Sequence, residues 1–496
     1  MRKKNNLLKL VIFALVACMA VCVLVSCGDN GGTPAETTEK NVDTANLPKC
    51  KATLQTGATL GTIKASAVKA EGDGTLYELV VTPKPGYIVS TMKIGDKELT
   101  VKDNKAECVL TGNVSVDVTY TRKDSDELQK RREKVIEKIQ TITGTQFKYD
   151  RDYDYKITTK DAHIYAGALY QGMPYSNHPT CSFEAFLDFT TGKDADGVYL
   201  VGNILTQPLY VWGNNCADVI YWSWATISTT MNCKYTGEFS ENFGISRVGD
   251  YELVKENFDD KNNYVNTSDI CENNGYMRMF EAYGMCKAGD AVIVFHPTGG
   301  HILMVDSVKL VNGKNGAIDG DRSYILYYDQ NSGYSEKNGI NGKTVYASCS
   351  YQVRMTFKEL FETGYIPVTC LELMDDEIEV EKEIVNDSIS KSKLTKINVT
   401  RGYIESNYYM SKLHMEITDA SGNVVYSANR YRDESNPKRI AFSWFTSEVA
   451  EEYKNIPIYT DILDLNSLPA GEYHCKVTAY LGTGSTYEVR DFQFTN

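Results

Sequence analysis

Cys216 is the residue of this sequence whose position says most about chemistry. It follows residues 213–215, Gly-Asn-Asn, which predict a turn, and apolar residues then recur at intervals of three to four. These apolar positions are Val219, Ile220, Trp224 and Ile227. The spacing predicts an amphipathic helix with the thiol in its first turn. Unpaired backbone N–H groups and the helix dipole favour the thiolate there, and the thiolate is the nucleophilic form of cysteine.

His301 is the residue that could exchange a proton with this thiol. Residues 289–295 predict a strand, and His301 opens a second apolar strand, HILMVDSV. Either residue taken alone is more often structural, since most cysteines and histidines pack in cores or bond locally. A helix-start cysteine followed by a strand histidine favours nucleophilic catalysis. Trp212, Trp222 and Trp224 are interpreted first as packing residues and second as walls of a substrate groove.

The segments around these two residues, PLYVWGNNCADVIYW and KAGDAVIVFHPTGGHILMVDSV, resemble the NlpC/P60 cysteine peptidases, within the broader group that includes CHAP amidases. The positions that match are Tyr210, Trp212, Gly213, Cys216, Gly289, Asp290, Gly300 and His301. Asn215, Ala217 and Asp218 replace the family's Asp, Ser and Gly, and residues 234–270 look like an insertion. The resemblance covers less than half of the chain. It implies an α+β papain-like domain, in which a helix bearing the cysteine packs on an antiparallel sheet.

Acyl transfer is the chemistry that the resemblance implies, with Cys216 as nucleophile and His301 as its proton partner. The family places a third, orienting group on the strand after the histidine, where this chain has Asp329, Gln330 and Asn331. We prefer Asp329, because strand alternation from Tyr327 directs it to the same face, and rank Gln330 next. The backbone N–H of Cys216 would hold the oxyanion together with a second donor, for which Tyr210 is the best candidate.

The N-terminal residues predict export and anchoring. A basic start and an apolar stretch make residues 1–27 a signal sequence. Its end, Leu24-Val25-Ser26-Cys27, resembles a bacterial lipobox, in which Cys27 is acylated; an uncleaved membrane anchor is the alternative. Residues 28–46 are poor in apolar residues and predict a flexible tether. We therefore expect an extracytoplasmic protein held at the bacterial membrane by a lipid.

Charge and cysteine usage exclude some classes of function. The chain has 496 residues and a net charge of −13, which argues against nucleic acid and anionic lipid as partners. Its 13 cysteines show no CxxC pair, and the sequence has no HExxH motif. We expect no metal site and no cofactor. Unpaired thiols in an exported protein indicate a reducing habitat, and Cys50 with Cys108 is the one disulfide that we would test first.

Three globular parts follow the tether. Residues 48–122 alternate apolar and polar and resemble InlB B-repeat modules of bacterial surface proteins. Residues 124–374 hold the hydrolase domain, which begins with a helix capped at Asp124 or Ser125 and with a solvated face of Lys and Arg; residues 162–176 look like a helix leading into a loop. Residues 375–389 are an acidic linker. Residues 390–496 predict an immunoglobulin-like β-sandwich.

The expected function is hydrolysis of peptide bonds in cell-wall peptidoglycan, with wall peptides as partners and the acyl-enzyme of Cys216 as intermediate. The substrate class comes from the resemblance alone. The alternative is a surface adhesion or binding lipoprotein whose papain-like domain no longer catalyses. We also expect residues 124–376 to form a unit that folds alone.

Overall fold

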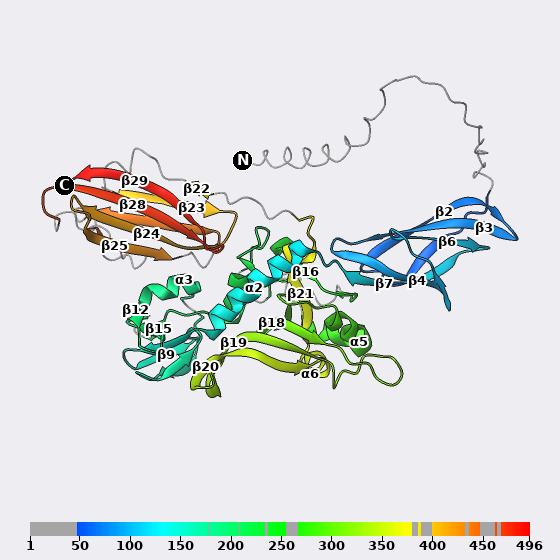
Figure 1. Ribbon diagram of the computed structural model, residues 1–496, viewed down its shortest axis with the longest axis horizontal. Helices are drawn as coiled ribbons and strands as arrows, with labels where there is room; N and C mark the ends of the chain where they lie inside the picture. Colours follow the sequence, from blue (N-terminus) through cyan, green and yellow to red (C-terminus); the bar gives the residue numbers. More distant parts are fainter. Residues whose placement is uncertain are drawn as a thin grey trace, which may run out of the picture. The chain divides into compact units, whose positions relative to one another are not determined.

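The computed structural model describes residues 47–177, 179–207, 209–233, 237–253, 266–378, 385–387, 399–431, 436–446, 462–463 and 468–496. The predicted signal sequence, Cys27 and the tether lie outside these residues, as does most of the predicted acidic linker. Pro48–Asn496 form one compact unit. The described chain is a mixed α+β protein with more strand than helix, as expected (Figure 1). No described helix is both long and apolar enough to span a bilayer.

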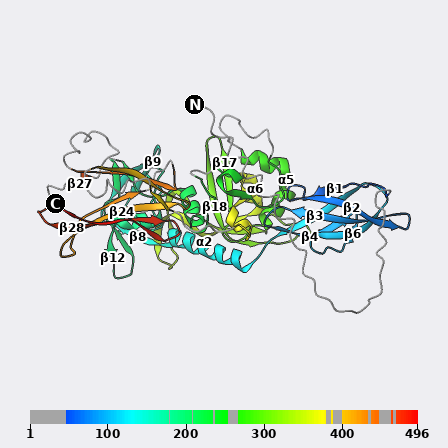
Figure 2. The same ribbon diagram turned by 90° about the horizontal axis from the view of Figure 1, so that it is seen from above.

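The N-terminal module, residues 48–122, consists of strands in two small sheets. The strands are β1 (Ala52–Thr56), β2 (Gly61–Glu71), β3 (Gly74–Pro83), β4 (Tyr87–Ile94), β5 (Lys97–Leu99), β6 (Lys105–Leu110) and β7 (Val114–Arg122). Their orders are β1-β7-β4-β5 and β2-β3-β6. Figure 2 labels β1, β2, β3, β4 and β6 in the blue part of the chain. Buried and exposed residues alternate along β6 and most of β3, so one face of each strand supplies the module's core.

The central domain is built on a ten-stranded sheet of order β12-β13-β8-β11-β20-β19-β18-β17-β21-β16. Those strands are β8 (Gln146–Tyr149), β11 (Leu169–Gln171), β12 (Thr190–Lys193), β13 (Tyr199–Val201), β16 (Ile245–Arg247), β17 (Ala291–His296), β18 (Gly299–Lys309), β19 (Tyr324–Asn338), β20 (Thr344–Thr356) and β21 (Ile366–Cys370). Two small hairpins lie outside it: β9 (Tyr153–Ile157) with β10 (Lys160–Ile164), and β14 (Leu205–Gln207) with β15 (Tyr210–Val211). Strands β17 to β20 run antiparallel in sequence order.

The helices of this domain are α2 (Asp126–Gly144), α3 (Phe183–Phe186), η2 (Leu187–Phe189), α4 (Cys216–Trp224), η3 (Glu241–Phe243), α5 (Thr267–Gly284), α6 (Phe357–Thr363) and α7 (Leu371–Met374). The Ser125 side chain caps α2 by accepting from Leu128 N. Helix α4 packs against α2 and against β18 and β19, so it contacts both a helix and the sheet. The sequence predicted this helix start, because Gly213 and two asparagines favour a turn immediately before the apolar residues of α4.

The expected helix at residues 162–176 is wrong. This stretch forms the end of β10 and then β11, which pairs with both β8 and β20. Tyr170 on β11 packs its ring against Tyr149, Tyr334 and Tyr346, with centroids 5.2 to 5.6 Å away. These non-local aromatic contacts override the local pattern, because strand preference depends chiefly on cross-strand packing.

The solvated face expected on α2 is also wrong in part. Arg131 and Arg132 are 6% and 3% exposed, although the mixed charges of the helix suggested exposure. Arg131 donates to the backbone carbonyl of Glu372 at 2.9 Å, and Arg132 to that of Leu373 at 2.7 Å. The two guanidinium groups satisfy the end of helix α7, so α2 is held by polar contacts on a face that the sequence assigned to water.

The C-terminal part contains two four-stranded sheets, of orders β22-β23-β26-β27 and β25-β24-β28-β29. The strands are β22 (Val385–Asp387), β23 (Val399–Ser406), β24 (Met410–Asp419), β25 (Val424–Tyr431), β26 (Arg439–Thr446), β27 (Ile462–Leu463), β28 (Glu472–Leu481) and β29 (Thr486–Thr495). One core receives Ile404 and Ile440 from the first sheet and Leu413 and Val477 from the second. Two sheets that share a core form a β-sandwich.

Candidate active site

Cys216 is the first residue of helix α4, and Asn215 caps that helix. The Asn215 side-chain oxygen accepts from Ala217 N and Asp218 N, each at 3.0 Å. The cap therefore leaves the N–H of Cys216 itself available to another acceptor. Cys216 is 6% exposed, and every residue of α4 is buried. The expectation of an amphipathic helix is therefore wrong, because α4 has no exposed face. It is buried all round because α2 and the sheet cover different sides of it.

His301 lies on β18, and its imidazole is held by Asp329 on the neighbouring β19. The distance from His301 Nε2 to Asp329 Oδ2 is 2.8 Å, and Asp329 Oδ1 accepts from Ser350 N at 3.0 Å. Both carboxylate oxygens are thus bonded, which fixes the plane of the carboxylate. Nε2 is occupied by Asp329, so Nδ1 is the ring nitrogen left to face the thiol.

The other two residues considered for the orienting position bond elsewhere. Gln330 Nε2 donates to the backbone oxygen of Met173 at 2.9 Å, and Asn331 Oδ1 accepts from Gly333 N at 3.1 Å. The register of β19 against β20 shifts between Tyr327 and Asp329. Such a bulge redirects side chains and is frequent beside active sites.

The electrostatics of His301 connect it with both expected partners. Burial by itself would lower the pKa of His301, but hydrogen bonding to Asp329 and to Cys216, with the charge of both, raises it to about 10. The imidazolium form is therefore favoured well above neutral pH. A cationic imidazole beside a thiol stabilises the thiolate, which is the arrangement that nucleophilic catalysis by cysteine needs.

Tyr175 is a residue beside Cys216 that the sequence reasoning missed. Burial, followed by the charge and hydrogen bonding of the Cys216 thiol, raises the pKa of Tyr175, while an interaction with the backbone N–H of Cys216 acts against this rise. The tyrosine hydroxyl thus interacts with both the thiol and the N–H of the nucleophile. No periodic pattern signals this residue, which lies in the irregular loop after β11.

Backbone pairing fixes that loop against the turn that precedes the nucleophile. Tyr175 pairs with Asn214 in a parallel bridge; Asn214 N donates to Pro174 O at 3.1 Å, and Ser176 N donates to Asn214 O at 2.9 Å. A Cβ on Gly213 would stand 2.2 Å from Pro174 O, so this close approach requires glycine. The position of Tyr175 is therefore set by the same turn that begins α4.

Tyr210, the expected oxyanion donor, lies in β15, where it pairs with Gln207 of β14. The Cys216 thiol interacts with Tyr175 and His301, and a role for Tyr210 stays a prediction. The tryptophans pack as expected. Trp224 Nε1 donates to Gly289 O at 2.7 Å, the Trp222 ring meets Tyr409 edge-on, and Trp212 stacks on Phe189.

Asp290, one of the residues matched to the NlpC/P60 pattern, has a structural role. It is fully buried and forms ion pairs with Arg122, the last residue of β7, and with Arg132 of α2, the latter at 3.0 Å. Burial alone would raise the pKa of Asp290, but the charges of the two arginines lower it. The carboxylate joins the N-terminal module, helix α2 and the start of β17.

The described residues hold no group of three or more His, Cys, Asp or Glu side chains that could bind a metal ion. The described cysteines, Cys50 and Cys108 among them, are free thiols.

Comparison with known proteins adds no identity to this geometry: no protein-family model matches the chain, and no curated protein matches it.

Proposed function

We propose that the protein is a cysteine hydrolase that cleaves an amide or peptide bond through an acyl-enzyme on Cys216. The observation that carries the proposal is the convergence on one imidazole of a helix-start thiol and a buried carboxylate, with His301 Nε2 bonded to Asp329 at 2.8 Å. Nucleophile, base and orienting group come from α4, β18 and β19, which pack directly on one another.

In the first step the Cys216 thiolate attacks the substrate carbonyl carbon, and the carbonyl oxygen becomes an oxyanion. We assign two donors beside Cys216 to this oxyanion, the residue's own N–H and the hydroxyl of Tyr175, which would exchange their contact with each other for the oxyanion. His301 then gives its proton to the leaving amine, the C–N bond breaks, and a thioester remains. Water attacks the thioester and gives its proton to His301, the C–S bond breaks, the carboxylic acid leaves, and the thiolate and protonated His301 are restored.

Peptidoglycan peptides are the substrate class that we propose, and the outer face of a bacterial membrane the location. Both rest on the sequence: the resemblance to NlpC/P60 peptidases and the lipobox-like Leu24 to Cys27. Digestion of purified wall, with the released fragments identified by mass, tests the substrate. If both the detergent partitioning and the N-terminal mass of the Cys27→Ala chain are the same as in wild type, lipid anchoring is contradicted.

The competing function is adhesion by a protein whose papain-like domain is inactive. Alkylation with iodoacetamide distinguishes the hydrolase from the inactive adhesion protein. Cys50 is the internal control, because it lies in the N-terminal module and is more exposed than Cys216. At pH 7 we expect Cys216 to react faster than Cys50 despite its burial, and His301→Ala to remove this advantage. Reaction of Cys216 no faster than Cys50 in wild type would leave the adhesion function as the better account.

A further inference from the structure

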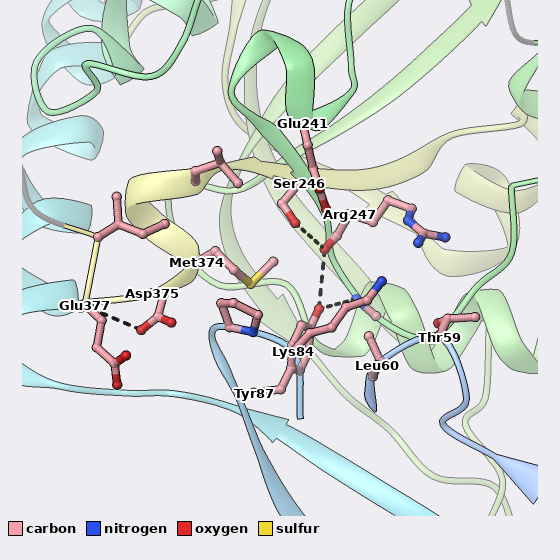
Figure 3. A pocket seen from close by; sticks show the side chains of 14 residues that line it. Thr59, Leu60, Lys84, Tyr87, Glu241, Ser246, Arg247, Met374, Asp375 and Glu377 are labelled. Carbon is pink, nitrogen blue, oxygen red and sulfur yellow. Dashed lines mark hydrogen bonds between the residues drawn. The ribbon is translucent and has the colours of Figure 1, made fainter. Parts of the chain in front are cut away.

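A cavity of about 480 Å³ lies away from Cys216, where the N-terminal module meets residues 241–249 and 371–378 (Figure 3). Its walls are mixed. Leu60, Pro85, Met374 and Ile378 supply apolar surface, while Lys84 and Arg247 supply positive charge. A volume of this size is in the range of sites that hold small ligands.

Hydrogen bonds hold the two sides of this cavity together. The Asp250 carboxylate accepts from Gly57 N at 3.1 Å and from Thr59 N at 3.3 Å. Gly249 N donates to the Tyr87 hydroxyl at 2.9 Å, and Gly86 N donates to the carboxylate of Asp375 at 3.1 Å. These bonds cross between the module and the central domain, so the cavity is formed before any ligand arrives.

The charges of the cavity are unevenly compensated. Asp375 and Glu377 line one side, and both pair with Lys123, at 2.8 and 3.0 Å. Lys84 and Arg247 stand apart from these acids in Figure 3. Within the described part of the chain, neither of the two cations forms an ion pair, and Arg247 donates to the backbone oxygen of Tyr251 at 2.6 Å.

The environment of Lys84 shows that its charge is only partly offset. Burial, and then repulsion from Arg247, lower its pKa, in spite of attraction from Glu241 and Asp250. The carboxylate of Asp250 is also engaged by Arg278 at 3.2 Å, and Glu241, a third acid that lines the cavity, is exposed. A negative group placed between the two cations would relieve their repulsion. A guanidinium and an ammonium together match the geometry of a carboxylate.

We propose that this cavity binds a small organic carboxylate that carries an apolar chain, with the carboxylate at Lys84 and Arg247 and the chain against Leu60, Pro85 and Met374. The apolar walls favour this class over inorganic phosphate, which would leave them in contact with water. The free carboxyl end of a short peptide belongs to the same class. The site is separate from the proposed catalytic centre, and the inference does not depend on hydrolysis.

Calorimetry of the full chain with hexanoate tests the proposal, with hexanamide as the uncharged probe of the same shape. Cys216→Ala serves as background, so that the proposed nucleophile cannot turn over the amide. We expect hexanoate to bind about tenfold more tightly than hexanamide, because only the acid offers a negative charge to the two cations. Lys84→Gln should remove this preference, and Arg247→Gln should weaken it.

Lys64→Gln is the matched control, because Lys64 is an exposed lysine of the same module and does not line the cavity. It should leave hexanoate binding unchanged. Equal binding of acid and amide, or a preference that survives Lys84→Gln, would overturn the proposal. Binding of phosphate that depends on Lys84, without binding of hexanoate, would overturn it as well, because the apolar chain would then have no place in the site.

Discussion

The imidazole of His301 interacts with two groups, the Asp329 carboxylate and the Cys216 thiol. Asp329 holds Nε2 and is itself held by Ser350 N, so neither ring nor carboxylate needs to reorganise during a proton transfer. The opposite ring nitrogen remains for the thiol. This division of the two nitrogens explains why Asp329 is better suited than Gln330, whose amide is engaged by Met173.

The raised pKa of His301 predicts a pH dependence of stability. The folded state raises this pKa from 6.5 to about 10, so protonated His301 stabilises the fold fully below pH 6.5, and this stabilisation is lost as the pH rises towards 10. Between these pH values the melting temperature of wild type should fall more steeply than that of His301→Gln. If the melting temperatures of wild type and His301→Gln change with pH by the same amount across this range, the charge assigned to His301 is contradicted.

Tyr175 and Tyr210 can be compared directly as oxyanion donors. Tyr175→Phe removes the hydroxyl that interacts with the N–H of Cys216 and keeps the ring. We expect kcat for a chromogenic peptide amide to fall by about 10²–10³, the usual cost of losing one oxyanion donor, with KM little changed. Tyr210→Phe is the matched control and should retain most of the activity. The reverse result would assign the role to Tyr210.

At the scale of elements, the start of α4 and the strands that bear His301 and Asp329 follow from short-range signals. A turn of Gly and Asn before an apolar run, and apolar strands flanked by glycine, are local patterns that hold in most contexts. Tyr175 lies outside this reach. Its position depends on a bridge to Asn214 and on the space that Gly213 leaves, and no local spacing encodes either.

Non-local contacts also explain the elements that the sequence misassigned. Within residues 162–176, β11 forms because it pairs with β8 and β20. Arg132 is buried because it binds Asp290 and the end of helix α7, which come from distant parts of the chain. In each case at least one of the contacting partners lies more than a hundred residues away in the sequence. A local sequence pattern does not include such a partner. Periodicity specifies a face; it does not specify what covers that face.

The junction of β7, α2 and β17 gives a prediction about stability. Asp290→Asn leaves Arg122 and Arg132 buried without a counter-charge and should destabilise the protein by roughly 3–5 kcal/mol. Asp319→Asn removes the partner of an exposed arginine, Arg322, and should cost far less than Asp290→Asn. Urea unfolding measures both. A similar effect of the two substitutions would mean that Asp290 does not anchor the junction.

At the scale of the whole molecule, the central domain depends on its neighbours. Tyr409 of the C-terminal part bonds through its hydroxyl to Cys233 O at 2.6 Å, and Ser411 bonds to Ser182. Arg122 of the N-terminal module forms an ion pair with the carboxylate of Asp290. These groups are buried, so removing them exposes core and leaves polar partners unsatisfied.

These contacts weigh against independent folding of residues 124–376, which stays untested. We expect this fragment to melt without cooperativity or to be insoluble, because it lacks Arg122, Tyr409 and Ser411. Residues 48–496, which form one compact unit, should melt cooperatively and keep a reactive Cys216. Calorimetry on the two fragments compares them. A sharp transition in the shorter fragment would restore the earlier expectation.

The free thiols have a consequence for how the chain reaches its folded state. The described cysteines are unpaired and all except Cys50 are buried, so in the finished fold oxidants and other thiols have poor access to those outside the proposed active site. During folding the same groups are exposed together, and any pair that oxidises must be broken before the core can close. Folding therefore competes with cross-linking, and the yield of refolding should rise with added reductant. Once folded, the protein should tolerate removal of that reductant.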